Sequence, residues 1–229
     1  MIEDPPVITL KRHVHRPSAE QLAAFKHVPT GFIADAMNGR GAMDARIKPV
    51  IAGQETFSGV ALPVHVGPAD NLGVMAALHL GKAGDVVVAA ADGYQATAVV
   101  GDIVLGMMKN KGLHGFVTDG CARDLIGIEE MGLPCFASGI TPNSPVKNGP
   151  ATVNLPIVCG GVSVDAGDIV CADRDGVVVV PYAQIDAVLK ALEDVKAAEA
   201  KLLPRVKAGL TQPDWLEAFM NSSAVKSLD

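Results

Sequence analysis

Three charged residues have the types and the spacing that suit ligand binding. Asp102 lies in GDIVLGMMKNKG, the pair Arg123-Asp124 lies in HGFVTDGCARDLIG, and twenty residues separate Asp102 from the pair. Each segment has the pattern of a strand that gives way to a helix, and open α/β sheets bind ligands at that edge. An Arg near a helix start opposes the positive end of the helix dipole. Helix stability therefore does not explain Arg123.

Adjacent side chains on a helix do not face each other. We therefore expect that Arg123 and Asp124 do not simply neutralise one another, and that each is available to a ligand. The acids also have local explanations. Asp102 and Asp124 suit a helix start, and Asp119-Gly120 suits a turn. Arg123 is the residue that local structure explains worst.

Several common catalytic machines are absent from the sequence. The chain has no G-x-x-x-x-G-K-[ST] loop, no G-x-G-x-x-G after a strand, no G-x-S-x-G and no H-E-x-x-H. Lysines at predicted helix ends are expected to stay solvated, without the buried surroundings that activate a Schiff-base amine. These lysines are Lys82, Lys109 and Lys111.

The remaining candidate ligands for a metal have structural explanations. His13 and His15 have no third ligand nearby, and the other histidines are scattered. The acids of VDAGDIVCADRDG fail the spacing of a calcium loop and fit turns instead. The cysteines form no C-x-x-C pair and lie in apolar segments, which predicts buried free thiols. They are Cys121, Cys135, Cys159 and Cys171.

Composition predicts a globular protein with short buried strands and tight turns. Of 229 residues, 49% are hydrophobic and only 19% are charged, which predicts a substantial core and some surface buried between subunits. A net charge of −6 without a basic cluster argues against nucleic-acid binding. No apolar run approaches the ~20 residues of a membrane span, and no secretory signal is recognisable. We expect a cytoplasmic protein with no membrane partner.

Sequence patterns predict alternating elements followed by hairpins. A capping box of Ser18 and Gln21 predicts a helix over 18–25, and Thr30 can cap a second over 31–38. A Pro/Asn/Gly-rich loop over 140–156 suits a lid or an interface arm. Hairpins over 155–164 and 167–181 make the sheet system mixed. Further helices are expected at about 70–81, 97–111, 122–131 and 183–209, and strands at 57–66, 85–91, 115–118 and 134–140.

The last helical run, broken near Pro204, carries a long apolar stripe. A stripe of this length at the end of a chain often packs on a neighbour. We expect one domain, with a core over 1–182 and a C-terminal helical extension over 183–229 that packs on a neighbouring subunit. The stripe consists of Leu189, Leu192, Val195, Ala198 and Leu202.

These motifs together resemble the RraA-like family, and within it the class II pyruvate aldolases that cleave 4-hydroxy-4-methyl-2-oxoglutarate and 4-carboxy-4-hydroxy-2-oxoadipate. The likeness spans about residues 28–210. Beyond the three charged residues it includes the T-x-x-x-x-D-A stretch at Thr30, ADNLGVMAALHLGKAGDVVV, both hairpins and the helix that carries Glu199. The aldolase pattern has a Gly four residues before the first Asp, where this chain has Ala98. That departure either narrows the pocket or marks a different substrate.

The resemblance implies an α/β fold of the swivelling β/β/α type, layered, with mixed sheets and a C-terminal helical extension. It implies a homotrimer or homohexamer with the active site between subunits, and Mg²⁺ or Mn²⁺ rather than a lysine imine. Asp124 would bind the metal directly and Asp102 would hold metal-bound water. Glu199 would reach metal-bound water from a neighbouring subunit. Carboxylate and water ligands suit a hard cation.

The same resemblance implies how a 2-oxo acid would bind. Arg123 would contact the 2-oxo oxygen, where negative charge develops in an enolate. The start of the helix after Gly101, with the backbone N–H groups near Ile103 and Val104, would take the carboxylate. We therefore assign catalytic roles to Arg123 and Asp102.

Our first hypothesis is a metal-dependent lyase that cleaves a 4-hydroxy-2-oxo acid to pyruvate and an oxo acid. Oxaloacetate decarboxylation is an expected side activity, because both reactions pass through pyruvate enolate. Two alternatives remain: a non-enzymatic inhibitor of ribonuclease E, as some relatives are, and a lyase for another sugar acid or oxo acid. Those inhibitors resemble a shorter core without the C-terminal helices, so the segment with Glu199 favours the enzyme. The glycine-rich loop of a methyltransferase is missing.

Overall fold

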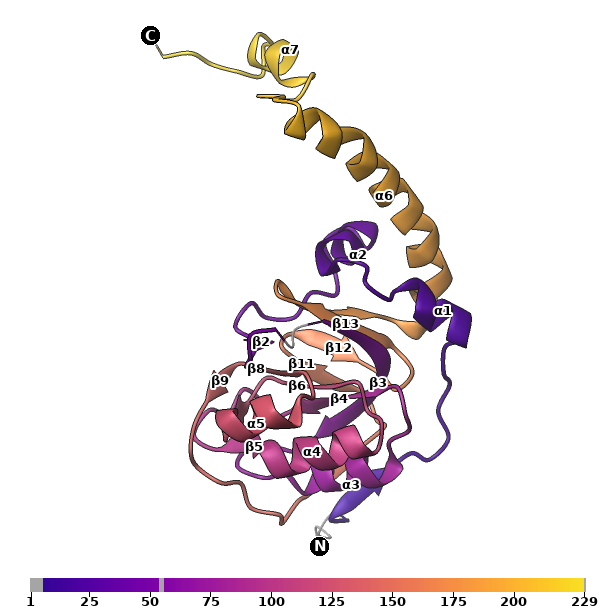
Figure 1. The fold of residues 1–229 in the computed structure, drawn as a ribbon, viewed down its shortest axis with the longest axis vertical. Coiled ribbons are helices and arrows are strands. Elements are labelled where there is room, and N and C mark those ends of the chain that lie inside the picture. Colours follow the sequence, from indigo (N-terminus) through magenta and orange to yellow (C-terminus); the bar gives the residue numbers. More distant parts are fainter. Residues whose placement is uncertain (1–5, 54–55, 229) are drawn as a thin grey trace, which may run out of the picture.

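A nine-stranded mixed sheet forms the centre of the protein, described by a computed structural model over residues 6–53 and 56–228. Figure 1 shows this sheet with helices packed against it. Its middle consists of parallel strands with almost uninterrupted apolar sequences, as expected for strands covered on both faces. These strands are β3 (Phe57–His65), β4 (Asp85–Ala90), β6 (Gly115–Thr118) and β8 (Cys135–Ala137).

Antiparallel strands extend this parallel centre at its edges. Along its free side, β3 pairs first with β13 (Ile169–Asp173) and then with β10 (Ala151–Val153). The strand β13 forms a hairpin with β14 (Gly176–Val180). The outermost strands are β1 (Ile8–Leu10) and β2 (Lys48–Pro49).

Two smaller sheets complete the β structure of the described chain. One is an antiparallel hairpin of β11 (Ile157–Cys159) and β12 (Val162–Val164). The other is parallel and joins β5 (Ala98–Val100), β7 (Cys121–Ala122) and β9 (Gly139–Ile140). The fold is therefore layered α/β with mixed sheets, which confirms the fold class expected from the sequence.

Helices cover one face of the central sheet, and the hairpin of β11 and β12 covers the other. One core lies under α3 (Leu72–Leu80), α4 (Asp102–Asn110) and α5 (Leu125–Met131), which contribute side chains such as Val74, Leu105 and Ile128. On the opposite face, Ile157 and Val164 of the hairpin pack with Val86 and Val88 of β4.

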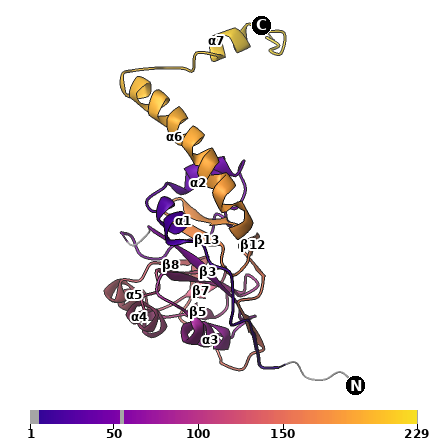
Figure 2. The same cartoon turned by 90° about the vertical axis from the view of Figure 1, so that its right-hand side faces the viewer.

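A third core joins the N-terminal helices to the base of the C-terminal extension. The helices α1 (Ala19–Ala24), α2 (Thr30–Ala36) and α6 (Ile185–Lys207) meet β13 and β14 there, and α6 follows a short 3₁₀ turn at Tyr182–Gln184. In Figures 1 and 2, α6 runs away from the body and ends near the short helix α7 (Leu216–Met220). No helix in the described ranges is long and apolar enough to cross a membrane.

Most predicted elements are confirmed with small shifts of their ends. Ser18 caps α1 through the predicted reciprocal bonds with Gln21. The strand at 115–118 is found as predicted, and both hairpins are present. The four cysteines are buried free thiols, and burial raises the pKa of Cys135 and Cys171 to about 12.

Five local predictions are wrong. The segment 97–111 contains the strand β5 before α4 begins, and the helix predicted from residue 122 begins at Leu125 because β7 precedes it. The loop over 140–156 contains β10. Thr30 does not cap α2, because its hydroxyl and backbone N–H both donate to Asp173. Pro204 lies inside a continuous α6, close enough to its end that few helical bonds are affected.

Candidate active site

The segments that carry Asp102 and Arg123-Asp124 lie side by side, because the strands that precede them pair in parallel. Val100 of β5 pairs with Ala122 of β7, and the backbone N–H of Arg123 donates to the carbonyl of Val100 at 3.1 Å. The chain then turns into α4 at Asp102 and into α5 after Asp124. Parallel pairing therefore places both charged segments at the same sheet edge, as predicted.

A pocket of about 290 Å³ opens at this edge. It collects all the site residues predicted within one chain, namely Gly101, Asp102, Ile103, Val104, Arg123 and Asp124. Further lining residues come from β5, from α3 and its N-cap, from α4 and from the loop after β9, and sequence reasoning did not assign them to the site. They are Asn71, Met75, Val100, Met107, Ser144, Pro145 and Lys147.

Two glycines let the carboxylates lie close to the backbone. A Cβ on Gly101 would be 2.5 Å from Oδ2 of Asp124, and a Cβ on Gly127 would be 2.2 Å from Oδ2 of Asp102. Real Cβ atoms do not approach other atoms this closely, so any larger residue at either position would displace a carboxylate. The carboxylates therefore lie in a cradle that depends on the absence of these two side chains.

Arg123 and Asp124 do contact each other, which corrects our expectation. The guanidinium Nε lies 3.1 Å from Oδ2 of Asp124. The helix rule fails because Arg123 precedes α5, and Asp124 is the N-cap residue with left-handed backbone angles of φ 62° and ψ 47°. Both side chains are partly exposed, at 34% and 41%. The pair is thus an ion pair in the pocket wall that remains open to a ligand.

The guanidinium has a second partner on the opposite wall. Its Nη1 donates to Oγ of Ser144, which lies in the loop between β9 and β10. Sequence analysis identified this segment only as a possible lid or interface arm. The contact depends on the path of the loop through space, and no local pattern around Ser144 signals it.

Asn71 is a second residue that the sequence did not single out. Its Nδ2 donates to the carbonyl of Val99 at 3.1 Å, which fixes the orientation of the amide. Its Oδ1 is buried and has no hydrogen-bond partner among the described residues. The side chain thus presents a fixed amide in the pocket wall at the start of α3.

The first turn of α4 offers fewer backbone donors than expected. Oδ1 of Asp102 accepts the N–H of Ile103 at 2.6 Å, so the Asp102 carboxylate already uses this donor. Leu105 bonds back to the carbonyl of Gly101. Val104 is therefore a better placed donor for an anion than Ile103.

Two residues singled out in the sequence lie away from the pocket. Glu199 is exposed on the protruding part of α6 and does not line the pocket of its own chain. Ala98 is buried in β5 and is not a lining residue. Its backbone N–H instead donates to the carbonyl of Asn143, at the base of the loop that carries Ser144.

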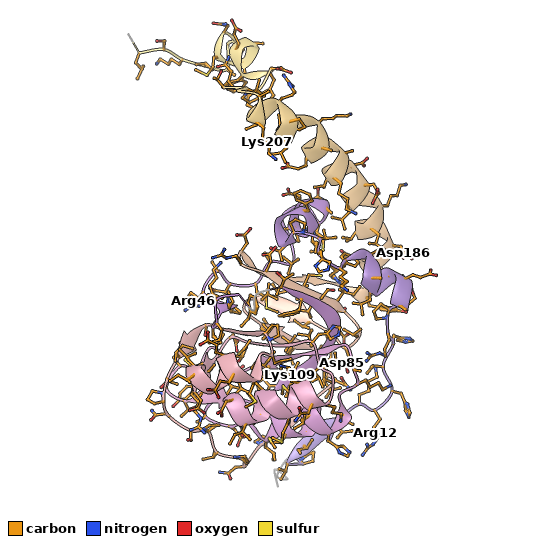
Figure 3. All side chains as sticks on the ribbon, in the orientation of Figure 1. Arg12, Arg46, Asp85, Lys109, Asp186 and Lys207 are labelled. Atoms are coloured by element: carbon orange, nitrogen blue, oxygen red, sulfur yellow. The ribbon has the colours of Figure 1, made fainter. Side chains whose placement is uncertain are left out.

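The other chemical candidates have structural roles. Lys109 and Lys111 donate to carbonyls at helix ends, those of Met131 and of Leu78 and His79 respectively. Figure 3 labels Lys109 in the region of α4. Asp119 accepts the backbone N–H of Ala91 at 2.7 Å, and burial raises the pKa of this carboxyl. The lysine that lines the pocket is Lys147, which the sequence analysis had not considered.

The pocket fits a hard divalent cation. Its possible metal donors are two carboxylates, Asp102 and Asp124, held in the glycine cradle. No group of three or more His, Cys, Asp or Glu side chains converges anywhere in the described part of the chain. Mg²⁺ is commonly held by one or two carboxylates and keeps several waters, so this sparse oxygen donor set suits Mg²⁺ or Mn²⁺.

Comparisons with known proteins agree with this architecture. A protein of Halalkalibacterium halodurans, provisionally named 4-hydroxy-4-methyl-2-oxoglutarate aldolase, is 38% identical over 169 residues, which are 74% of this chain and 80% of the relative. Streptomyces coelicolor RraAS2, described as an unusual member of the RNase ES inhibitor RraA family, superposes with a TM-score of 0.74 at 26% identity, covering 83% of this chain and 100% of that one.

An uncharacterized protein from Pseudomonas syringae pv. tomato shares the fold, with a TM-score of 0.75 at 24% identity over 86% of this chain and 97% of the other. The family model described as RraA-like, Aldolase/RraA, matches residues 30–179, which include both pocket motifs. The chain therefore belongs to the RraA-like family of aldolases and RraA proteins.

Proposed function

We propose that this protein is a divalent-metal-dependent lyase that cleaves a 4-hydroxy-2-oxo acid into pyruvate and a second oxo acid. The observation that supports it best is the pocket, which gathers two carboxylates, one arginine and a helix N-terminus in about 290 Å³. These groups match the needs of a reaction that passes through an enolate. The 38% identical relative with an aldolase name supports the same class.

Asp124 would hold the cation directly and Asp102 would hold it through a water molecule. When bound, a divalent cation supplies Lewis-acid stabilisation of the negative charge that forms on the 2-oxo oxygen. Arg123 supplies permanent positive charge and directed N–H donors at the same oxygen. Its partners in the wall leave the guanidinium with N–H groups for a ligand, because a guanidinium has five.

The proposed cleavage breaks the bond between C3 and C4. The electron pair stays on C3 and is delocalised onto the 2-oxo oxygen, which Arg123 faces. The C4 hydroxyl gives its proton to water and becomes the carbonyl of the second product, and this proton balances the one that C3 takes up from water. Protonation of C3 then gives pyruvate. The start of α4, with Val104 as a donor, would hold the pyruvyl carboxylate.

Oxaloacetate decarboxylation would use the same residues. Loss of carbon dioxide from C3 also leaves the electron pair of pyruvate enolate, so the Arg123 contact stabilises both reactions. We propose this as a side activity.

Glu199 would complete the site from a neighbouring subunit. In its own chain it is exposed on the part of α6 that leaves the body, and the apolar residues Leu202, Leu203 and Val206 are 42–50% exposed beside it. Near the pocket, Ile103 and Ile126 are 72% and 79% exposed. One exposed apolar surface thus lies beside Glu199 on α6, and another lies beside the pocket. They support a homotrimer or homohexamer in which two neighbouring subunits form each active site.

The test is pyruvate release from a panel of 4-hydroxy-2-oxo acids and from oxaloacetate. Activity should disappear after exhaustive EDTA treatment and return with Mg²⁺ or Mn²⁺. Calorimetry should show weaker metal binding for Asp124→Ala. Full activity without metal, or unchanged metal binding in that variant, would contradict the proposal. Borohydride with substrate should leave Lys147 unmodified, and a pyruvyl adduct there would indicate an imine mechanism.

The alternative function is inhibition of an RNA-degrading endonuclease. This alternative is supported by the superposition with Streptomyces coelicolor RraAS2, which is described as an unusual member of the RNase ES inhibitor RraA family. The C-terminal extension with Glu199 favours the lyase function, because the inhibitors of this family resemble only the core of this chain, without its C-terminal helices. Absence of pyruvate from every substrate, together with slower RNA cleavage by ribonuclease E in the presence of this protein, would favour the inhibitor.

A further inference from the structure

We propose that Ser144 is a positioning residue that fixes the guanidinium of Arg123 for catalysis. This inference rests on the proposed lyase function and adds a residue to it. The residue lies twenty positions beyond Asp124, in a loop that the charged motifs do not include. Its role follows from the contacts of the guanidinium.

Arg123 is held at two different nitrogens by partners from two different segments. Nε lies 3.1 Å from the Asp124 carboxylate, and Nη1 donates to Oγ of Ser144. One contact would leave the guanidinium able to swing about the side chain, whereas two contacts on a planar group fix both its position and its plane. The remaining N–H groups, mainly on Nη2, then have one direction in which to meet a substrate.

The loop that carries Ser144 is attached to the body on both sides of it. On one side, the carbonyl of Asn143 accepts the N–H of Ala98 at 3.0 Å, and its Nδ2 donates to Ala96 at 2.8 Å. On the other side, Val146 donates to the carbonyl of Ala69 at 2.8 Å and accepts the N–H of Asn71 at 3.0 Å.

A buried carboxylate secures the end of the same loop. Oδ2 of Asp70 accepts the backbone N–H groups of Asn148 and Gly149, while its Oδ1 accepts the N–H of Leu72 in the first turn of α3. Asp70 is 5% exposed. Hydrogen bonds therefore hold the segment around Ser144 on both sides, so it is a rigid loop rather than a lid. The position of the Ser144 hydroxyl is fixed by these bonds.

This arrangement predicts a specific kinetic effect. Arg123 matters most when charge forms on the 2-oxo oxygen, so misdirected N–H groups should weaken the transition state more than the bound substrate. Ser144→Ala should lower kcat by about tenfold, the lower end of what is lost when an outer partner of a functional group is removed. The KM should change little, and Ser144→Thr should restore kcat because it keeps the hydroxyl.

The experiment measures steady-state pyruvate release for wild type, Ser144→Ala and Ser144→Thr. The matched control is Ser163→Ala, which changes an exposed residue of strand β12. A cycle with Arg123→Ala tests the route of the effect: if Ser144 acts through Arg123, adding Ser144→Ala to that variant costs nothing further. An equal loss in both backgrounds, or full kcat in Ser144→Ala, would overturn the proposal.

A measurement independent of turnover keeps the inference separate from the function. In protein labelled with ¹⁵N-arginine, the Nε–H resonance that disappears in Arg123→Lys belongs to Arg123. It should broaden or shift in Ser144→Ala and keep its position in Ser144→Thr and Ser163→Ala. An unchanged resonance in Ser144→Ala would refute positioning even if the protein releases no pyruvate, whereas a changed one without pyruvate would refute only the lyase.

Discussion

The pocket and the C-terminal extension differ in how their side chains are held. Around the pocket, Arg123 and both carboxylates each have a bonded partner or a close backbone neighbour, and the loop with Ser144 is attached on both sides. On α6, burial ends after Leu192, and the remaining helix has exposed side chains. Figure 3 shows Lys207 far from the body, near the end of that helix.

This difference indicates two kinds of function within one chain. A helix of 23 residues is about 35 Å long. Helices in proteins gain most of their stability from packing an apolar face against other elements. In the outer half of α6 every side chain from 196 to 207 is exposed within the described chain, where Arg205 pairs with Asp214, so a neighbour is the simplest source of further stability. The pocket is built by one chain, whereas the completion by Glu199 that we propose would require a second.

The largest effect is expected on the pocket side. Arg123→Lys keeps the charge but not the fixed N–H donors, and loss of one such transition-state contact costs ~10²–10³-fold in kcat. Steady-state pyruvate release measures this. The control is the metal concentration that gives half-maximal activity. It should stay unchanged, because Asp124 should still bind the cation. A kcat within a factor of two of wild type would remove Arg123 from the mechanism.

A smaller effect should follow from filling the glycine cradle. Gly101→Ala places a Cβ where Asp124 lies, so metal affinity by calorimetry should fall by about tenfold or more. The matched control is Gly31→Ala on α2, where nothing lies within 4 Å of the added atom. Equal affinities in both variants would show that Asp124 does not depend on Gly101.

Subunit mixing tests the extension directly. Asp124→Ala and Glu199→Ala should each be nearly inactive, yet co-assembly should restore sites that combine intact Asp124 with intact Glu199 from the neighbour. Random exchange in a closed ring gives about a quarter of such sites. Native mass spectrometry verifies the mixing. Verified mixed oligomers without recovered activity would mean that Glu199 acts within its own chain or not at all.

The smallest effects separate the inner and outer parts of α6. Leu192→Ala removes a buried side chain and should lower the free energy of unfolding by about 2–5 kcal/mol. Leu202→Ala changes a residue that is 45% exposed, so it should weaken assembly rather than the fold of the body. Urea unfolding and sedimentation velocity distinguish these outcomes. Identical unfolding losses without any change in assembly would make the two parts of the helix equivalent.

The sequence predicted the pocket well where the information is local. Asp102 and Arg123-Asp124 each follow a short apolar strand, and parallel strands bring such positions to the same edge. The same short strands were partly mistaken for helix, because apolar runs such as Ala98–Val100 fit a buried strand and a helix face equally well.

What the sequence could not predict depends on distant contacts. Ser144 and Asn71 meet in the pocket because the loop after β9 is bonded to Asp70, which lies 78 and 79 positions before its partners Asn148 and Gly149. The Arg123–Asp124 pair was misjudged because a helix rule was applied to residues that precede the helix. Neither the path of a loop nor the backbone angles of a single N-cap residue follow from periodicity.

The left-handed backbone conformation of Asp124 lowers the free energy of unfolding of the protein. An Asp at an N-cap usually bonds the first turn of its own helix, which stabilises a protein by about 0.5–2 kcal/mol, but Asp124 makes no such bond. Left-handed angles cost more for Asp than for glycine, although Asp tolerates them better than most other residues. Asp124→Gly should therefore raise the Tm in thermal unfolding, and calorimetry should show a loss of the cation binding that we propose for Asp124. A family member that has lost catalysis would be free to make that exchange, so the residue at this position distinguishes selection for activity from selection for robustness.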